Sequence, residues 1–172
     1  LLKSLGESLR NEKQLESLLM RLCFESRLIS QNEKVMIDFF EVCSQTLKKA
    51  YFHLRSESIF SDELEIFSQG LSKLENLHCL GISLFGFEGK IEQLCETFQR
   101  MKALEELDFK IQRPDFSEYK DVRVLNLKFP AQLKKLALRM NTDNILFDPA
   151  ITLWSLENLV HLELEFPHLW SD

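Results

Sequence analysis

The chain has 172 residues, of which 45% are hydrophobic and 28% are charged, and its formal net charge is −6. These proportions are typical of a globular protein and exclude a largely disordered chain. The acidic balance argues against a broad nucleic-acid or anionic-membrane surface, since both need a basic face, and the apolar runs are too short to span a membrane.

The chain has four cysteines, and they are widely spaced. The sequence has no C-x-x-C motif, since its cysteines are Cys23, Cys43, Cys79 and Cys95. In a chain of this length such spacing is typical of reduced, mostly buried thiols. We therefore expect an intracellular protein, cytoplasmic by default.

Segments with helical periodicity recur along the chain. Residues 1–14 carry leucines at helical spacing and are predicted to be the helix of a preceding repeat, so we expect this sequence to be a piece of a longer polypeptide. Ser30 and Glu33 form a capping box before apolar residues that recur at three- and four-residue steps, which predicts a second helix. Further helices with one apolar face are predicted after Ser61 and after Gly89.

The later helical signals are weaker. Asp115 with Glu118 could cap a short helix, but the apolar residues of 122–129 partly alternate, so a short extended piece could replace part of it. The structure of 115–129 is therefore left open between these two alternatives. Asp148 followed by Pro149 predicts one more helix start, because proline at the first helical position loses no hydrogen bond.

Between the helices lie segments in which apolar residues follow a spacing of three, three, two and two, as from Leu74 to Leu84. The last four of these segments repeat at intervals of 27, 29 and 26 residues. For the first segment, several apolar residues from Leu15 to Leu22 fit almost equally well. We take the central residues of six repeats to be Leu22, Ala50, Leu80, Leu107, Leu136 and Leu162. Strands that alternate with helices at a fixed period predict parallel strands joined by right-handed crossovers, in units that must stack on one another.

This pattern resembles the leucine-rich repeat family, whose signature is L-x-x-L-x-L-x-x-N/C-x-L. The match extends through the asparagine in the segment from Leu133 to Asn141, whereas the segments around Leu107 and Leu162 match the strand half only. The resemblance covers nearly all of 1–172 and is closest to the ribonuclease-inhibitor-like and F-box-associated types of repeat. It implies one α/β solenoid domain, an αβ horseshoe with parallel strands on the concave face and helices on the convex face.

In this family the residues between the strand leucines point to the concave face, which usually binds the partner. If the repeats are in register, Glu105 faces Lys134, Glu106 faces Lys135 and Arg139 faces Glu165, as an intramolecular ladder of opposite charges that contributes little because it is exposed. The alternative is a charged surface that selects a partner. The candidate partner-binding residues on this face are Tyr51, His53, Lys110, Arg139, Glu163 and Glu165.

Two other surfaces are candidates for contact with a partner. On the predicted helices, the pairs Phe39–Phe40 and Ile66–Phe67 each place one apolar group off the inward stripe. Near the end of the sequence, Trp154 and Trp170 are expected to pack in the core or at the terminus, and Trp170, if exposed, is a possible terminal contact with a neighbouring subunit. Neither end of the solenoid has the polar pattern of a capping repeat, so we expect further repeats or a partner to cover both.

No chemical signature accompanies the repeats. The histidines and cysteines lack the spacing of a zinc site, no glycine-rich phosphate loop is present, and no nucleophile has a motif around it. We therefore expect no enzyme activity, cofactor, metal or nucleic acid. The sequence favours a non-enzymatic protein–protein interaction scaffold, or an accessory subunit of a larger intracellular complex. The alternative is the substrate-recognition region of a regulatory protein such as an F-box-type ubiquitin-ligase receptor.

Overall fold

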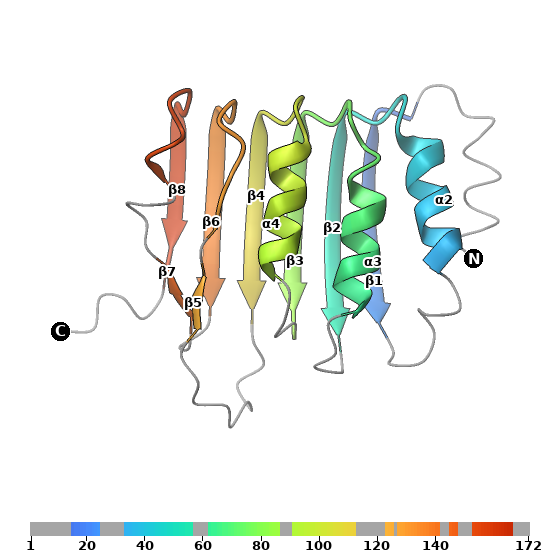
Figure 1. Cartoon of the computed structure of the whole chain (residues 1–172), viewed down its shortest axis with the longest axis horizontal. Coiled ribbons are helices and arrows are strands. Elements are labelled where there is room, and N and C mark those ends of the chain that lie inside the picture. The colour runs from blue at the N-terminus through green and yellow to red at the C-terminus, as the bar shows by residue number, and fades with distance from the viewer. Residues whose placement is uncertain are drawn as a thin grey trace.

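The computed structural model describes residues 15–24, 33–56, 62–86, 91–112, 123–125, 127–141, 145–147 and 153–166. Within them the chain is an α/β protein built on a six-stranded, all-parallel sheet whose strand order, β1-β2-β3-β4-β6-β8, is also the order along the chain (Figure 1). Its strands are β1 (Ser17–Phe24), β2 (Lys49–Ser56), β3 (Cys79–Phe85), β4 (Glu106–Gln112), β6 (Lys135–Asn141) and β8 (His161–Glu165).

Three helices cover one face of this sheet (Figure 1). They are α2 (Glu33–Cys43), α3 (Asp62–Leu71) and α4 (Ile91–Arg100), and each connects two neighbouring parallel strands. These helices confirm the three helices predicted after Ser30, Ser61 and Gly89. None of the helices in the described ranges is long and apolar enough to cross a membrane.

The layer outside β6 and β8 is different. The strands β5 (Arg123–Leu125) and β7 (Ile145–Phe147) pair with each other in parallel as a separate two-stranded sheet. Strand β5 confirms the short extended piece that the sequence allowed within 115–129, whereas β7 was not predicted. The helix starts predicted at Asp115 and Asp148, like residues 1–14, lie outside the described residues.

The strands pair in one continuous register. Ala50, Leu80, Leu107, Leu136 and Leu162 are successive Cα partners across the sheet, as the repeat intervals predicted. The prediction for the first strand was wrong, because Leu18 is the partner of Ala50, while Leu22 is paired with Leu54. In a strand where apolar residues alternate, a shift of four keeps the same side chains on the same face, so the sequence pattern alone cannot choose between them.

The core lies between the sheet and the helices. Every second side chain of β2, β3, β4 and β6 is buried, and α2, α3 and β2 together contribute a phenylalanine cluster. Its ring centroids lie 5.1 to 5.7 Å apart and most of its rings meet edge to face, the geometry that aromatic pairs prefer. The cluster comprises Phe39, Phe40, Phe52 and Phe67. The expectation that Phe39–Phe40 and Ile66–Phe67 expose an apolar group was wrong, since all four side chains are buried.

A repeated set of hydrogen bonds fixes where each strand begins. At the start of β1, one carbonyl, that of Glu16, accepts bonds from the backbone N–H groups of Lys48 and Lys49, and the same two-to-one arrangement recurs at every later strand of the sheet. In the loop before β3, the side chain of Asn76 donates to the carbonyl of Ser44 in the preceding loop. The amides Gln132 and Asn158 donate in the same way to Met101 and Ala131.

These amides join neighbouring loops at the end of the sheet where the chain enters each strand. The sequence Leu-Glu-Asn-Leu occurs at both 74–77 and 156–159, and this repetition indicated the two asparagines that make these bonds.

Candidate functional site

The sheet face opposite the helices, called the open face here, carries the side chains that alternate with the buried ones. Across the sheet these side chains form rows, because the strands are in register. One row runs from Arg21 through His53, Ser83, Lys110 and Arg139 to Glu165. Neighbouring members of a row are about 5 Å apart at the backbone, so their side chains share one surface.

A groove of about 230 Å³ lies on the open face over β2, β3, β4 and β6. Its hollow follows from side-chain size, because β3 presents only Gly81 and Ser83 between the longer side chains of its neighbours. The side chains of Tyr51, His53, Asp108, Lys110, Gln112 and Arg139 line the groove. Four of the six sequence-predicted site residues are thereby brought together.

Tyr51 forms one wall of the groove and leans over β3. A Cβ atom placed at Gly81 would lie 2.4 Å from Cδ1 of Tyr51, so only glycine lets the ring lie in this position. The Tyr51 hydroxyl is 3.4 Å from Sγ of Cys79. This hydrogen bond is the main reason that the pKa of Tyr51 is raised to about 12, with the Cys79 charge, burial and nearby carboxylates adding to it. Tyr51 is therefore neutral at physiological pH and, being 40% exposed, available to a ligand.

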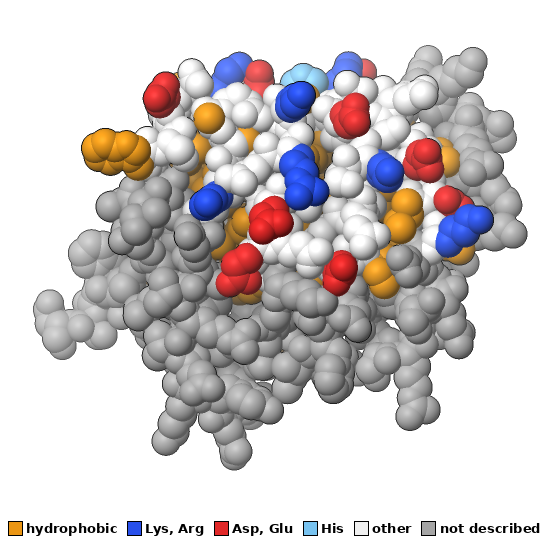
Figure 2. Space-filling model, viewed as in Figure 1, with side chains coloured by type: hydrophobic (Ala, Val, Ile, Leu, Met, Phe, Trp, Pro, Cys, Tyr) orange, Lys and Arg blue, Asp and Glu red, His pale blue; other side chains and the backbone are white. Residues whose placement is uncertain are grey.

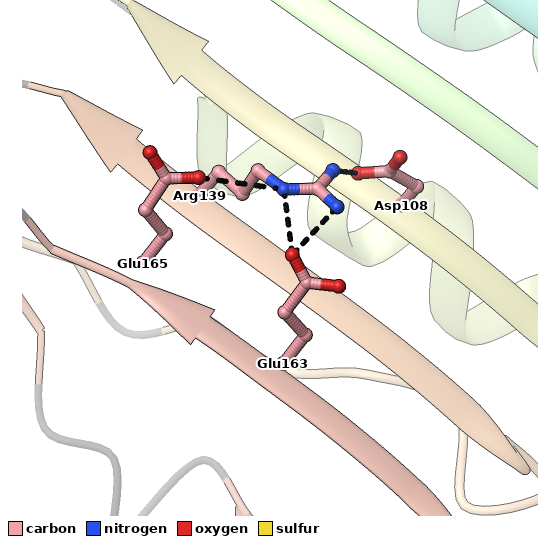
Figure 3. A network of polar contacts seen from close by, with 4 residues as sticks. All are labelled: Asp108, Arg139, Glu163 and Glu165. Carbon is pink, nitrogen blue, oxygen red and sulfur yellow. Dashed lines mark hydrogen bonds and ion pairs between the residues drawn. The ribbon is translucent and has the colours of Figure 1, made fainter.

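Arg139 forms the opposite wall of the groove and is held by three carboxylates (Figure 3). Its guanidinium lies 2.5 Å from Asp108 on β4, 2.8 Å from Glu163 and 3.5 Å from Glu165 on β8. The bonds to Asp108 and then Glu163 raise the pKa of Arg139. The pairing with Glu165 confirms the prediction, whereas the contacts with Asp108 and Glu163 were not predicted.

The remaining predicted ion pairs are also formed. Lys134 lies 2.8 Å from Glu105, and Lys135 lies 2.8 Å from Glu106. At the other side of the sheet, Lys48 lies 2.6 Å from Glu16. These pairs lower the pKa of Glu105 and Glu16 and raise that of Lys135, chiefly through the hydrogen bond to the partner. All of these side chains are well exposed, so the pairs set the charge pattern of the face more than its stability.

Other basic residues on the open face have no such partner among the described residues. Within the described part of the chain, the side chains of Arg21, Lys49, His53 and Lys110 form no hydrogen bond or ion pair. Arg55 lies over the ring of Phe85, at 5.3 Å from its centroid. The open face thus carries unpaired cations over β1–β4, and its cations over β6 are neutralised by β4 and β8.

The helix-covered side is less distinctive. Figure 2 shows charged side chains of both signs scattered over this side. Two open hollows of about 430 and 340 Å³ lie along α4, and their linings are mostly polar, with Glu92, Glu96, Arg100 and Lys128 around the first. We find no apolar binding groove among the described residues there.

The last strand of the sheet is incompletely covered. Leu162 and Leu164 are 41% and 39% exposed, although their partners Leu136 and Leu138 on β6 are fully buried. Trp154, in the turn before β8, is 89% exposed, so the expectation that it packs in the core was wrong. The predicted terminal contact Trp170 lies outside the described residues.

The described residues offer little for catalysis or metal binding. No group of three or more His, Cys, Asp and Glu side chains among them is arranged to hold a metal ion. Burial raises the pKa of Cys43 to about 11 and raises that of Cys95 further, so neither thiol is an activated nucleophile. What the open face can do chemically is form hydrogen bonds and ion pairs with another molecule.

Comparison with known proteins gives no relative. No family model matches the chain, and neither a curated protein nor a solved structure matches it significantly. The function must therefore be argued from the site itself.

Proposed function

We propose that this chain is a non-enzymatic protein–protein interaction module, a scaffold or accessory subunit of an intracellular assembly, that binds its partner on the open face. In this proposal the chain is a leucine-rich-repeat solenoid and the open face is the concave face. The groove over β2, β3, β4 and β6 carries the proposal, since it combines an exposed tyrosine with cations that no residue in the described part of the chain satisfies.

The regularity of the sheet supports the solenoid. Six parallel strands follow one another in chain order, with apolar residues at the same register positions and the same hydrogen bonds where the strands begin. Units of this size cannot bury their apolar faces alone, so their stability comes from stacking on neighbours. A broad and rigid surface of parallel strands is the product of that stacking.

The composition of the groove supports a protein as the ligand. Tyrosine and arginine are enriched where proteins bind one another, because they supply a large contact area and several hydrogen bonds from one side chain. Tyr51 and Arg139 form opposite walls of the groove, and the bonds to Asp108, Glu163 and Glu165 hold Arg139 in place. A wall that is already ordered loses little side-chain entropy on binding.

The uncovered side of β8 supports a place inside an assembly. Leu162 and Leu164 occupy core positions of the repeat and are nonetheless exposed to about 40%. A further repeat or a partner subunit that covered them would remove this apolar surface from water.

Site-specific photocrosslinking tests the proposal. A photoreactive phenylalanine derivative replaces Tyr51 in the full chain inside cells, and the same residue replaces Lys73, an exposed residue after α3, as the control. We expect a discrete crosslink to another protein from position 51 and none from position 73. Crosslinks from position 73 alone, with both variants folded by circular dichroism, would contradict binding at the open face.

The native mass of the tagged protein in gentle extract separates the scaffold from the alternative, a recognition region of an F-box-type receptor. A stable position in a large particle supports the scaffold. Migration as a free species that meets its target transiently supports the receptor.

A further inference from the structure

The cations of the open face are arranged in one direction across the strands. Arg21, His53, Lys110 and Arg139 occupy the same register position on β1, β2, β4 and β6, with Ser83 between them on β3. We call these four residues the basic row. On β2, Lys49 lies four positions before His53 and Arg55 lies two positions after it, and both widen the row on the same face.

Lys110 and Arg139 lie directly opposite each other on neighbouring strands, where like charges repel. At Arg139 three carboxylates cancel the repulsion, but the described residues provide no such counter-charge at Arg21, His53 or Lys110. A row of unpaired cations on a chain with a net charge of −6 is a local feature that the overall composition does not explain.

Building on the proposed function, we propose that the basic row binds a short, extended, acidic segment of the partner protein. The carboxylates of the segment pair with Arg21, His53 and Lys110, and Tyr51 packs against its backbone. The acidic residues of the same face do not compete for these cations, because Asp108 is bound to Arg139 and Glu106 is bound to Lys135.

The dimensions of the row suit a short segment. From β1 to β4 the row crosses three strand spacings, which is about 14 Å. An extended chain covers this distance in about four or five residues. The hollow above Gly81 and Ser83 lets such a segment approach the sheet between Tyr51 and Lys110 without a clash.

A protein segment fits this surface better than a nucleic acid does. A nucleic acid needs a basic surface that continues along its phosphate backbone, whereas beyond β4 the cations of this face are already paired with Glu105, Glu106, Glu163 and Glu165. A surface that binds nucleic acid also presents several exposed aromatic side chains for base stacking. Among the described residues that line the groove, Tyr51 is the single exposed aromatic side chain.

Amide-shift titration of the full chain by NMR tests this inference. The probe is a blocked peptide with five consecutive aspartate and glutamate residues between Gly-Ser flanks, and the comparison peptide has asparagine and glutamine in their place. We expect saturable shifts, largest at the amides of β1–β4, with the acidic peptide only. Salt should weaken this binding, since exposed charges supply it.

Two variants that lose the same charge make the test specific. The double variant Arg21→Gln/Lys110→Gln removes two cations of the row, and we expect affinity for the acidic peptide to fall about five- to tenfold. Lys73→Gln/Arg100→Gln removes two exposed cations on and beside the helices, and we expect a change within about twofold. Circular dichroism confirms that both variants are folded.

Three outcomes would overturn the inference. They are absence of saturable binding by the acidic peptide, equal weakening by both double variants, and tighter binding of a single-stranded RNA oligonucleotide than of the peptide. None of them would contradict the proposed function, because a crosslink from position 51 to a partner would still place a protein on the open face. Absence of that crosslink together with retained peptide binding would instead contradict the proposed function alone.

Discussion

The two halves of the sheet, β2 to β4 and β6 with β8, differ in the elements that back them and in the partners of their charged side chains. Strands β2 to β4 are backed by helices and a cluster of phenylalanines, and their open face carries cations that have no ion pair among the described residues. Strands β6 and β8 have two short strands in the outer layer, and Arg139 is bound by three carboxylates. The half with β2 to β4 thus has basic side chains available to a ligand. In the half with β6 and β8, the charged side chains hold neighbouring strands together.

The largest expected effect concerns the core. Phe52 lies 5.6 Å from Phe40 and 5.1 Å from Phe67 between ring centroids, and it is 1% exposed. We expect Phe52→Ala to lower the free energy of unfolding by about 3–5 kcal/mol, because it leaves a cavity that the sheet cannot close. Leu164→Ala, at a 39% exposed site, should cost about 1 kcal/mol in urea denaturation.

This pair of variants also reports on the end of the sheet. A cost for Leu164→Ala as large as that for Phe52→Ala would mean that β8 is buried in solution. The contrast between interior and edge would then be wrong.

Two glycines give the next effect. A Cβ at Gly70 of α3 would lie 2.4 Å from Cδ2 of Phe40, which is buried and cannot move away. Gly70→Ala should therefore destabilise the protein by about 1–2 kcal/mol, although alanine ordinarily favours a helix. Thermal unfolding measures this, and a stabilised Gly70→Ala variant would contradict the packing of Phe40.

Gly81→Ala makes a contact of the same length on the open face, since its Cβ would lie 2.4 Å from Cδ1 of Tyr51. Tyr51 is 40% exposed and can swing out, so we expect a loss below about 1 kcal/mol. The swing breaks the hydrogen bond to Cys79, and the pKa of Tyr51 should fall from about 12 toward its ordinary value of 10.0. Ultraviolet titration of the tyrosines follows this change, and an unaltered titration curve would count against the bond.

The charged residues give a smaller effect. Arg139→Gln leaves Asp108, Glu163 and Glu165 without their cation and should cost about 0.5–1 kcal/mol in urea, because these carboxylates are exposed. Lys110→Gln, which removes a cation without a partner among the described residues, should change stability by less than about 0.5 kcal/mol. Equal costs would show that Lys110 is held by an ion pair in solution.

The smallest effect is the pH dependence of the exposed ladder. The folded-state pKa of Glu105 is lowered by Lys134, so the pair contributes stability above the ordinary value of 4.5 and loses it as the pH falls through the folded value. Between about pH 6 and pH 3, the Glu105→Gln/Lys134→Gln variant should therefore lose slightly less stability than the wild-type chain. A larger loss in the variant would reverse the sign that we assign to this pair.

Repeat spacing was enough to predict the parallel strands, the three helices and the row from Ala50 to Leu162. It failed at β1, where Leu18 and Leu22 lie on the same face and differ only in which neighbour they meet. That choice depends on the hydrogen bonds of Glu16 to the next strand, which no side-chain pattern contains.

The candidate site was predictable in part, for a related reason. Register alone placed Arg139 opposite Glu165, but an arginine also reaches diagonally to side chains two positions away on a neighbouring strand. Asp108 and Glu163 lie at those diagonal positions, and the closest contacts of Arg139 are with them. The groove was not predicted because its hollow depends on two small residues, Gly81 and Ser83, and small side chains carry no binding signal of their own in the sequence.

The order of the strands has a consequence for synthesis of the protein. In the six-stranded sheet each strand is added beside the one that precedes it in the chain, and no strand is inserted between two earlier ones. A growing chain on the ribosome can therefore place each new strand against an edge that already exists, at a sequence separation of 32 residues for β1 and β2 and 26 for β6 and β8. Every addition closes a loop of similar length, so a longer protein of this type would meet no larger entropic cost at its last repeat than at its second.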